Sequence, residues 1–257
     1  MKSFELITIP LREEKPRKKG LTTLPDRGLG YHAALDLVEQ AADYIDLIKL
    51  GWGTSRLISE EAVRKKIALY KDNQIKVSNG GTILEIAYQQ GKATQFFLSA
   101  RELGIDSIEV SNGVVNIPGE NKQKMISEAL ELGFEVFSEI GKKDPHEDSV
   151  ISLQERIEEA RHDLAAGASK VVIEAREGGK GIGIYDERGG VKEEMVSSLV
   201  SELGVDNIIF EAPDKSQQVY LILHLGASVN LGNIRTDDAI PLETLRRGLR
   251  GDTLGKL

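Results

Sequence analysis

Eight short apolar runs alternate with stretches of helical periodicity along the chain, and this alternation restricts the fold more than any other feature. In 31–43, for example, Ala34, Val38 and Ala41 recur at helical spacing, which predicts an amphipathic helix between two apolar runs. Strands that alternate with helices form a parallel sheet with helical crossovers. The predicted strands cover residues 20–24, 45–50, 75–78, 107–110, 135–140, 170–174, 207–210 and 228–231.

Three of the predicted helices end in the same signal, Glu-Leu-Gly, at Gly104, Gly133 and Gly204. Glycine accepts the left-handed backbone that ends a helix. Eight strand–helix units in 257 residues match a closed (β/α)8 TIM barrel. We therefore predict a single TIM-barrel domain over 1–257, of which 1–19 form an N-terminal arm.

An open, doubly wound α/β sheet is the alternative fold. The first predicted strand leads into 25–30, and the dinucleotide-binding pattern Gly-x-Gly-x-x-Gly is absent there. The glycine-rich run 177–183 comes late and opens no clear helix, so we expect a mobile loop at that place. The missing fingerprint favours the barrel.

Four predicted strands carry one glutamate near their carboxyl ends, where TIM barrels place their active sites. If these ends share one rim, the carboxylates crowd together, and they need a cation, a basic side chain or a held proton among them. The alternative is that some are ordinary salt-bridged barrel residues. The four are Glu109, Glu139, Glu174 and Glu211.

The chain has no cysteine, and its four histidines lack metal-ligand spacing and are expected at the surface. A metal would therefore be held by oxygen, and rim carboxylates suit a hard divalent ion such as Mg²⁺. We predict Asp26, Glu139 and Glu174 as its ligands.

Two lysines stand at predicted strand ends, Lys49 and Lys142, close to the packed core rather than on a solvated helix face. A lysine in such a place can serve as a proton-transfer group or as a Schiff-base nucleophile, and the sequence leaves both roles open. We predict Lys142, Lys49 and Glu139 as catalytic residues. Lys143 and Lys180 are expected to be solvated loop lysines.

The segment after the eighth predicted strand combines a glycine, an amide and an arginine, which favours an anion. Barrels often bind phosphate with the loops after strands seven and eight, so Gly232, Asn233 and Arg235 are the predicted phosphate site. The other predicted substrate-binding residues at the rim are Arg27, Lys49, Asn79, Asn112 and Arg176.

The net charge of −8 and the pI near 5.2 argue against a nucleic-acid partner, because no basic excess is present to neutralise phosphates. No signal peptide and no membrane-spanning run are recognised, so we expect a cytoplasmic protein. The basic cluster 15–19 is expected to solvate the arm or to contact a second subunit of a homo-oligomer.

Several of these segments together resemble the phosphosulfolactate synthase family. The combination of Lys-x-Gly-Trp-Gly-Thr at 49–54 with Glu-x-Gly-Lys-Lys at 139–143 is the most specific part of the resemblance. Arg27 stands where relatives often carry lysine, and the two cations contact anions differently. The remaining matching segments are 20–22, 26–28, 77–82, 108–113 and 211–213, so the resemblance covers nearly the whole chain.

The resemblance implies a carbon–sulfur lyase that adds sulfite to phosphoenolpyruvate with Mg²⁺ and gives (2R)-phospho-3-sulfolactate. Lys142 would protonate the carbon next to the attacked methylene, while Lys49 and Arg176 would hold the carboxylate or sulfite. The main alternative is a sugar-phosphate aldolase or epimerase on the same fold, because fold alone does not determine function. A ligand-binding barrel without chemistry is the third interpretation, and the retained lysines and carboxylates disfavour it.

Overall fold

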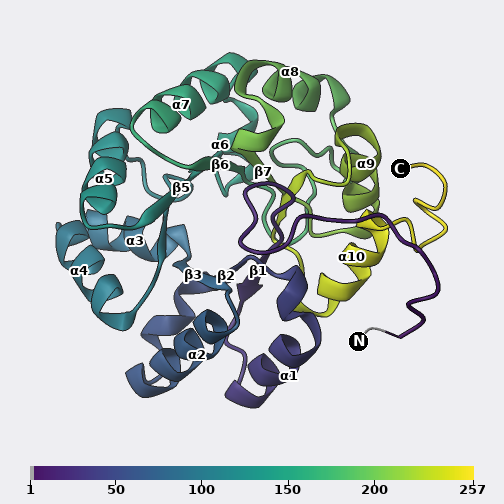
Figure 1. Cartoon of the computed structure of the whole chain (residues 1–257). Helices are drawn as coiled ribbons and strands as arrows, with labels where there is room; N and C mark the ends of the chain where they lie inside the picture. Colours follow the sequence, from purple (N-terminus) through teal and green to yellow (C-terminus); the bar gives the residue numbers. More distant parts are fainter. Residues whose placement is uncertain (1–2) are drawn as a thin grey trace.

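The computed structural model describes residues 3–257, so Met1 and Lys2 of the predicted arm lie outside the described residues. Within this range eight parallel strands follow one another around a closed barrel, and helices surround them (Figure 1). The amide of Leu231 donates to Leu21 O at 2.8 Å and thereby joins the last strand to the first. The strands are β1 (Thr23–Asp26), β2 (Leu47–Leu50), β3 (Lys76–Asn79), β4 (Ser107–Val110), β5 (Glu135–Ile140), β6 (Lys170–Ile173), β7 (Ile208–Glu211) and β8 (Asn230–Gly232).

This closed sheet confirms the predicted TIM barrel and excludes the open doubly wound alternative. Gly104 and Gly133 have φ values of 88° and 86°, as expected for glycines that end helices. The short helix α6 was not predicted, because one turn leaves no periodic pattern. The helices are α1 (Tyr31–Ala41), α2 (Glu60–Asp72), α3 (Gly81–Gln89), α4 (Ala93–Leu103), α5 (Gly119–Glu131), α6 (Pro145–Ser149), α7 (Leu153–Ala165), α8 (Glu193–Leu203), α9 (Lys215–Leu225) and α10 (Ala239–Arg246), with 3-10 turns η1 (Ala42–Tyr44), η2 (Gly51–Arg56), η3 (Val205–Asn207) and η4 (Thr236–Asp238).

An apolar layer fills the barrel interior directly below the polar rim. It forms a small cluster of its own, separate from the larger core between strands and helices. Side chains two residues apart on a strand point to the same face, so four of the five apolar residues of this layer are followed two positions later by a charged residue above them. The pairs are Leu47 with Lys49, Phe137 with Glu139, Val172 with Glu174, and Ile209 with Glu211.

The N-terminal arm packs against the opposite end of the barrel, where the strands begin. Arg17 pairs with Asp46 at 2.9 Å, and Lys15 donates to Ala42 O at 3.0 Å. Arg12 pairs with Glu243 of α10. The arm therefore covers the amino-terminal end of the barrel and leaves the carboxyl-terminal rim uncovered.

The glycine-rich run 177–183 lies in the loop between β6 and α8, as predicted for a loop. Tyr185 of this loop is buried, and its hydroxyl donates to Glu211 O at 2.7 Å, so the loop packs onto the rim. Among residues 3–257, no helix has the length and apolar character needed to cross a membrane.

Candidate active site

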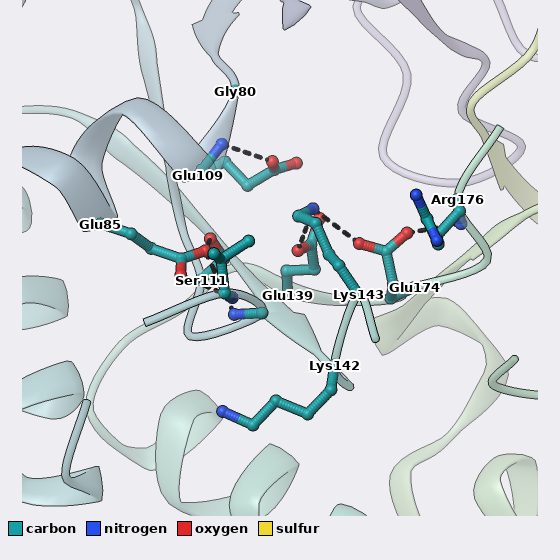
Figure 2. A network of polar contacts seen from close by, with 12 residues as sticks. Gly80, Glu85, Glu109, Ser111, Glu139, Lys142, Lys143, Glu174 and Arg176 are labelled. Carbon is teal, nitrogen blue, oxygen red and sulfur yellow. Dashed lines mark hydrogen bonds and ion pairs between the residues drawn. The ribbon is translucent and has the colours of Figure 1, made fainter. Parts of the chain in front are cut away.

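A cavity of about 120 Å³ lies at the carboxyl-terminal end of the barrel. Strand ends and the loops after them form its wall, so residues far apart in sequence meet there (Figure 2). Its lining includes Pro25, Lys49, Trp52, Gly81, Thr82, Glu109, Lys143, Glu174, Arg176, Glu211 and Asn233.

Lys49 projects from β2 into the centre of the predicted glutamates. Its ammonium group lies 3.1 Å from Glu109, 3.2 Å from Glu211 and 4.0 Å from Glu139. Burial alone would lower the pKa of Lys49, but these carboxylates outweigh burial and raise that pKa. Lys49 is therefore a fixed cation near neutral pH, and the predicted crowding of glutamates around a basic side chain is present.

Lys143 forms the second cationic centre of the site. Its ammonium group bridges Glu139 at 2.9 Å and Glu174 at 2.7 Å (Figure 2). Burial opposes the charged form, yet the two carboxylates raise the pKa of Lys143. The expectation that Lys143 is a solvated loop lysine was wrong, because its side chain turns inward and lines the cavity.

The two glutamates beside Lys143 titrate in opposite directions. Burial would raise the pKa of Glu139, but Lys143 and Lys49 outweigh burial and lower that pKa to about 2. Burial, and then the charges of Glu139 and Glu211, raise the pKa of Glu174 well above its usual range. Of the two, Glu174 is therefore the carboxyl group whose surroundings favour the protonated form, and a held proton is one of the devices expected to relieve the crowding.

Lys142 points away from the carboxylate cluster (Figure 2). Its ammonium group donates to Asn112 O at 2.5 Å, and its backbone amide donates to Asp148 at 2.9 Å. This geometry speaks against Lys142 as the proton donor. The neighbouring Lys143, and not Lys142, lies beside Glu139, where the proton donor was predicted.

Asp26 lies on the outer face of the barrel wall rather than in the cavity. In the strand register Asp26 is the partner of Leu50, whereas Pro25 is the partner of Lys49. Both carboxylate oxygens are engaged: one accepts from Lys66 at 2.6 Å and from Tyr70, and the other accepts the amides of 28 and 29. This corrects the prediction of Asp26 as a metal ligand.

The two asparagines predicted to bind substrate also contact protein groups and not the cavity. The side chain of Asn79 exchanges hydrogen bonds with the backbone of Glu109 at 3.1 and 3.3 Å, and so ties β3 to β4. The amide of Asn112 donates to Glu159 at 3.1 Å. Neither side chain lines the cavity within the described part of the chain, so their predicted substrate contacts gain no support.

The three residues of the predicted phosphate site lie in different surroundings. Gly232 is tightly packed, since a Cβ there would lie 3.0 Å from both Ile209 and Thr23. Asn233 lines the cavity and donates toward Glu211 at 3.4 Å. Arg235 is 58% exposed and pairs with Asp237 at 2.7 Å, outside the cavity lining found in residues 3–257. Arg235 is therefore not brought to the site.

Trp52 and Asn233 line one edge of the cavity, and Arg27 contacts both of them from behind that lining. The guanidinium of Arg27 lies 4.6 Å from the centre of the Trp52 ring and donates to Asn233 at 3.3 Å. Trp52, Arg176 and Asn233 have φ values of 55°, 56° and 54°, a left-handed backbone that is uncommon outside glycine. Such strained residues cluster at functional sites.

Sequence reasoning offered no basis for assigning Trp52 or the N-terminus of helix α3 to the site, although Gly51-Trp52-Gly53 and Gly80-Gly81-Thr82 are visible in the sequence. Helix α3 begins at the cavity, and Gly81 N donates to Glu109 at 2.8 Å. In the described chain the N-cap residue of α3, Gly80, provides no side-chain cap, and the first turn of α3 carries no acidic residue. A helix N-terminus attracts anions, and the carboxylate of Glu109 already binds at this one.

Glu139 and Glu174 are the residues best placed to hold a metal ion. The Oε2 atom of Glu139 is buried and lacks a hydrogen-bond partner within residues 3–257. No group of three or more Asp, Glu or His side chains in the same range forms a ready metal site. Mg²⁺ often takes one or two carboxylates and completes its shell with water and substrate oxygens, so these two glutamates fit it.

Comparison with known proteins gives the family of the chain. Residues 10–252 match the family model described as (2R)-phospho-3-sulfolactate synthase (ComA). Phosphosulfolactate synthase of Methanothermobacter thermautotrophicus is 48% identical over 257 residues, covering 100% of this chain and 99% of that protein. Phosphosulfolactate synthase of Methanocaldococcus jannaschii is 45% identical over 257 residues and is covered completely, as is this chain.

Among solved structures, 3-hexulose-6-phosphate synthase from Salmonella typhimurium is similar with a TM-score of 0.54 at 17% identity, covering 92% of this chain and 94% of that one. A likeness at this identity shows the barrel fold alone. The family follows from the full-length sequence matches and agrees with the resemblance of the rim segments. The chain belongs to the (2R)-phospho-3-sulfolactate synthase (ComA) family.

Proposed function

We propose that the protein adds sulfite to phosphoenolpyruvate and releases (2R)-phospho-3-sulfolactate, with the reaction taking place in the rim cavity. The observation that carries the proposal is that Lys49 and Lys143 line one cavity of a family member and pair there with four buried glutamates. Fixed cations of this kind suit a substrate with several negative charges.

The substrate anions have distinct partners in the proposal. Lys49 and Arg176 hold the carboxylate or the sulfite. The N-terminus of α3, with Gly81 and Thr82 at the cavity, holds the phosphate in place of the segment around Arg235. Arg235 lies outside the cavity lining found in residues 3–257 and pairs with Asp237 and Asp238 instead.

Sulfite sulfur attacks the methylene carbon, and the electron pair of the carbon–carbon double bond moves onto the substrate carboxylate. A proton then reaches the carbon that carries the phosphate, so a C–S and a C–H bond form and the phosphate ester is retained. We assign the proton donor to Lys143, because it is protonated, lines the cavity and contacts both Glu139 and Glu174. Lys49 remains the binding cation.

Mg²⁺ is part of the proposal, with Glu139 and Glu174 as its protein ligands. When bound there, the ion would supply positive charge for the enediolate that builds up on the carboxylate. The four glutamates exceed the two lysines in number, so the cluster itself favours an additional cation.

The aldolase alternative gains no support from the site. A Schiff-base lysine must lose its proton before it attacks a carbonyl. The surrounding carboxylates instead raise the pKa of both Lys49 and Lys143, which keeps both ammonium groups protonated. A borohydride trap with substrate should accordingly leave the protein unmodified.

Incubation of the protein with phosphoenolpyruvate, sulfite and Mg²⁺, followed by mass spectrometry, tests the proposal. We expect a phosphorylated sulfonate whose mass equals that of both substrates combined. Exhaustive chelation should abolish its formation, and Mg²⁺ should restore it. Free phosphate without the sulfonate would contradict the proposed function, whereas turnover unchanged by chelation would contradict the metal alone.

A further inference from the structure

Glu85 of α3 is a fully buried carboxylate that the reaction does not require. It accepts hydrogen bonds from the backbone amides of Gly113, Val114 and Val115 at 3.1, 2.7 and 2.6 Å, and from the Ser111 hydroxyl. No basic side chain within residues 3–257 pairs with it. A buried charge is tolerated when several donors satisfy it, and here all four donors come from the loop 111–115.

This loop forms the wall beside Lys143. The carbonyl of Gly113 accepts the backbone amide of Lys143 at 2.9 Å. A Cβ on Gly113 would lie 3.1 Å from Lys143 Cγ and 3.3 Å from Glu139 Oε1, so the glycine allows the close approach. The carbonyl of the preceding residue, Asn112, accepts a hydrogen bond from the ammonium group of Lys142 and holds it away from the cavity. One loop therefore directs the two adjacent lysines to opposite sides.

We propose that Glu85 is a positioning residue that sets the place of Lys143 through the loop 111–115. This inference rests on the proposed role of Lys143 in proton transfer. Among the described residues that line the cavity, Glu85 does not occur, so it acts behind the loop and not on the substrate. Helix α3 thereby serves the site twice, since its first turn also donates to Glu109 through Gly81.

The test is Glu85→Gln in the full-length protein, assayed with phosphoenolpyruvate, sulfite and Mg²⁺. The amide keeps one acceptor oxygen and loses the other, so two of the loop bonds fail. We expect kcat to fall about 10- to 100-fold, the range for a misplaced catalytic group, while KM for phosphoenolpyruvate changes less than about threefold. Ser111→Ala removes one donor and should give a smaller loss of the same kind. Glu131→Gln, on the exposed face of α5, is the matched control.

Wild-type kcat in Glu85→Gln would overturn the inference, as would a fall in kcat that merely follows the folded fraction measured by circular dichroism. If Glu85→Gln does not fold, Ser111→Ala decides, and an unchanged kcat in that variant would also overturn it. Lys143→Ala distinguishes a failure of the inference about Glu85 from a failure of the proposed role of Lys143. Lost turnover in Lys143→Ala with none lost in Glu85→Gln refutes the inference alone, whereas full turnover in Lys143→Ala refutes the proposed role of Lys143.

Discussion

At the amino-terminal end of the barrel, the fully buried Arg246 donates hydrogen bonds to the carbonyls of Ala227, Val229 and Leu21. At the carboxyl-terminal rim, four buried glutamates share two lysines. Arg246 is held there by neutral acceptors that lie in the segments leading into β1 and β8. The rim keeps more carboxylates than cations, and burial together with this excess of negative charge raises the pKa of Glu174.

This difference separates stability from function within one barrel. A charge bound to backbone carbonyls links the segments that carry them, and its removal takes a hydrogen-bond donor from each carbonyl. Unequal charges in a cavity instead favour the uptake of protons, cations or charged substrates. Variants at the rim should therefore change turnover, whereas variants at the opposite end should change stability.

The largest effect is expected for Lys143→Ala. General acid catalysis contributes about 10²- to 10⁴-fold, so turnover should fall by that factor while circular dichroism stays unchanged. Lys142→Ala is the matched control, because the neighbouring lysine points away from the cluster and should keep turnover within about fivefold. Equal losses in the two variants would contradict the assignment.

Arg246→Met tests the opposite end of the barrel. The carbonyls of Ala227 and Val229 lose this donor, while Leu21 O keeps the amide of Leu231. Each such loss costs about 1 to 3 kcal/mol, so the free energy of unfolding should fall by about 2 kcal/mol or more. Turnover per folded molecule should remain normal. Arg161→Met, which removes a surface pair with Glu202, should change stability by less than about 1 kcal/mol. A stable Arg246→Met protein with impaired turnover would contradict the assignment of stability to this end and of turnover to the rim.

Arg176 and Arg235 allow a second comparison, between an arginine that lines the cavity and one at the surface of the same end of the barrel. Arg176 lines the cavity, whereas Arg235 pairs with Asp237 at the surface. A charge-assisted contact contributes about 1.5 to 3 kcal/mol, so Arg176→Ala should weaken phosphoenolpyruvate binding by about tenfold or more. Arg235→Ala should change the affinity less than about twofold. Calorimetric titration with the opposite ranking would restore the predicted phosphate site around Arg235.

The smallest effect concerns the proton held by Glu174. The folded protein keeps this proton at pH values where the unfolded chain has released it, because burial raises the pKa of Glu174. The wild type should therefore lose stability as pH rises above the ordinary carboxyl pKa, with a limiting slope of about 1.4 kcal/mol per pH unit.

Glu174→Gln has no such proton to hold. Denaturant unfolding in metal-free buffer between pH 4 and 7 should show Glu174→Gln gaining stability relative to the wild type by about 1 kcal/mol or more. A stability difference that is independent of pH would show that Glu174 does not carry the proton.

The fold could be predicted because its signals are periodic and local. Apolar runs separated by helical patterns give the strand order, and glycines such as Gly104 and Gly133 mark helix ends. The rim glutamates could be predicted for the same reason, since Glu109, Glu139 and Glu211 lie within strands whose alternation determines the direction of the side chain.

The choice between Lys142 and Lys143 could not be predicted from the sequence. Both lie beyond Ile140, where β5 ends, and Gly141 turns the chain with a φ of 119°. Strand alternation no longer applies after such a turn, so tertiary contacts with the loop 111–115 decide which lysine enters the cavity. Arg235 follows β8 in the same way. Asp26 is different, because the register of β1 with β2 had to be known before its outward direction could be inferred.

The central claim is that Lys143, at the charge-rich rim, delivers the proton in an addition of sulfite to phosphoenolpyruvate. The direct test runs the reaction in heavy water with the wild type and with Lys143→Arg, and follows the product by mass spectrometry. We predict one deuterium on the carbon that carries the phosphate in the wild-type product. We also predict a loss of at least about 100-fold in the arginine variant, because guanidinium does not release its proton near neutral pH. Product without deuterium at that carbon, or a near-normal rate with Lys143→Arg, would contradict the claim.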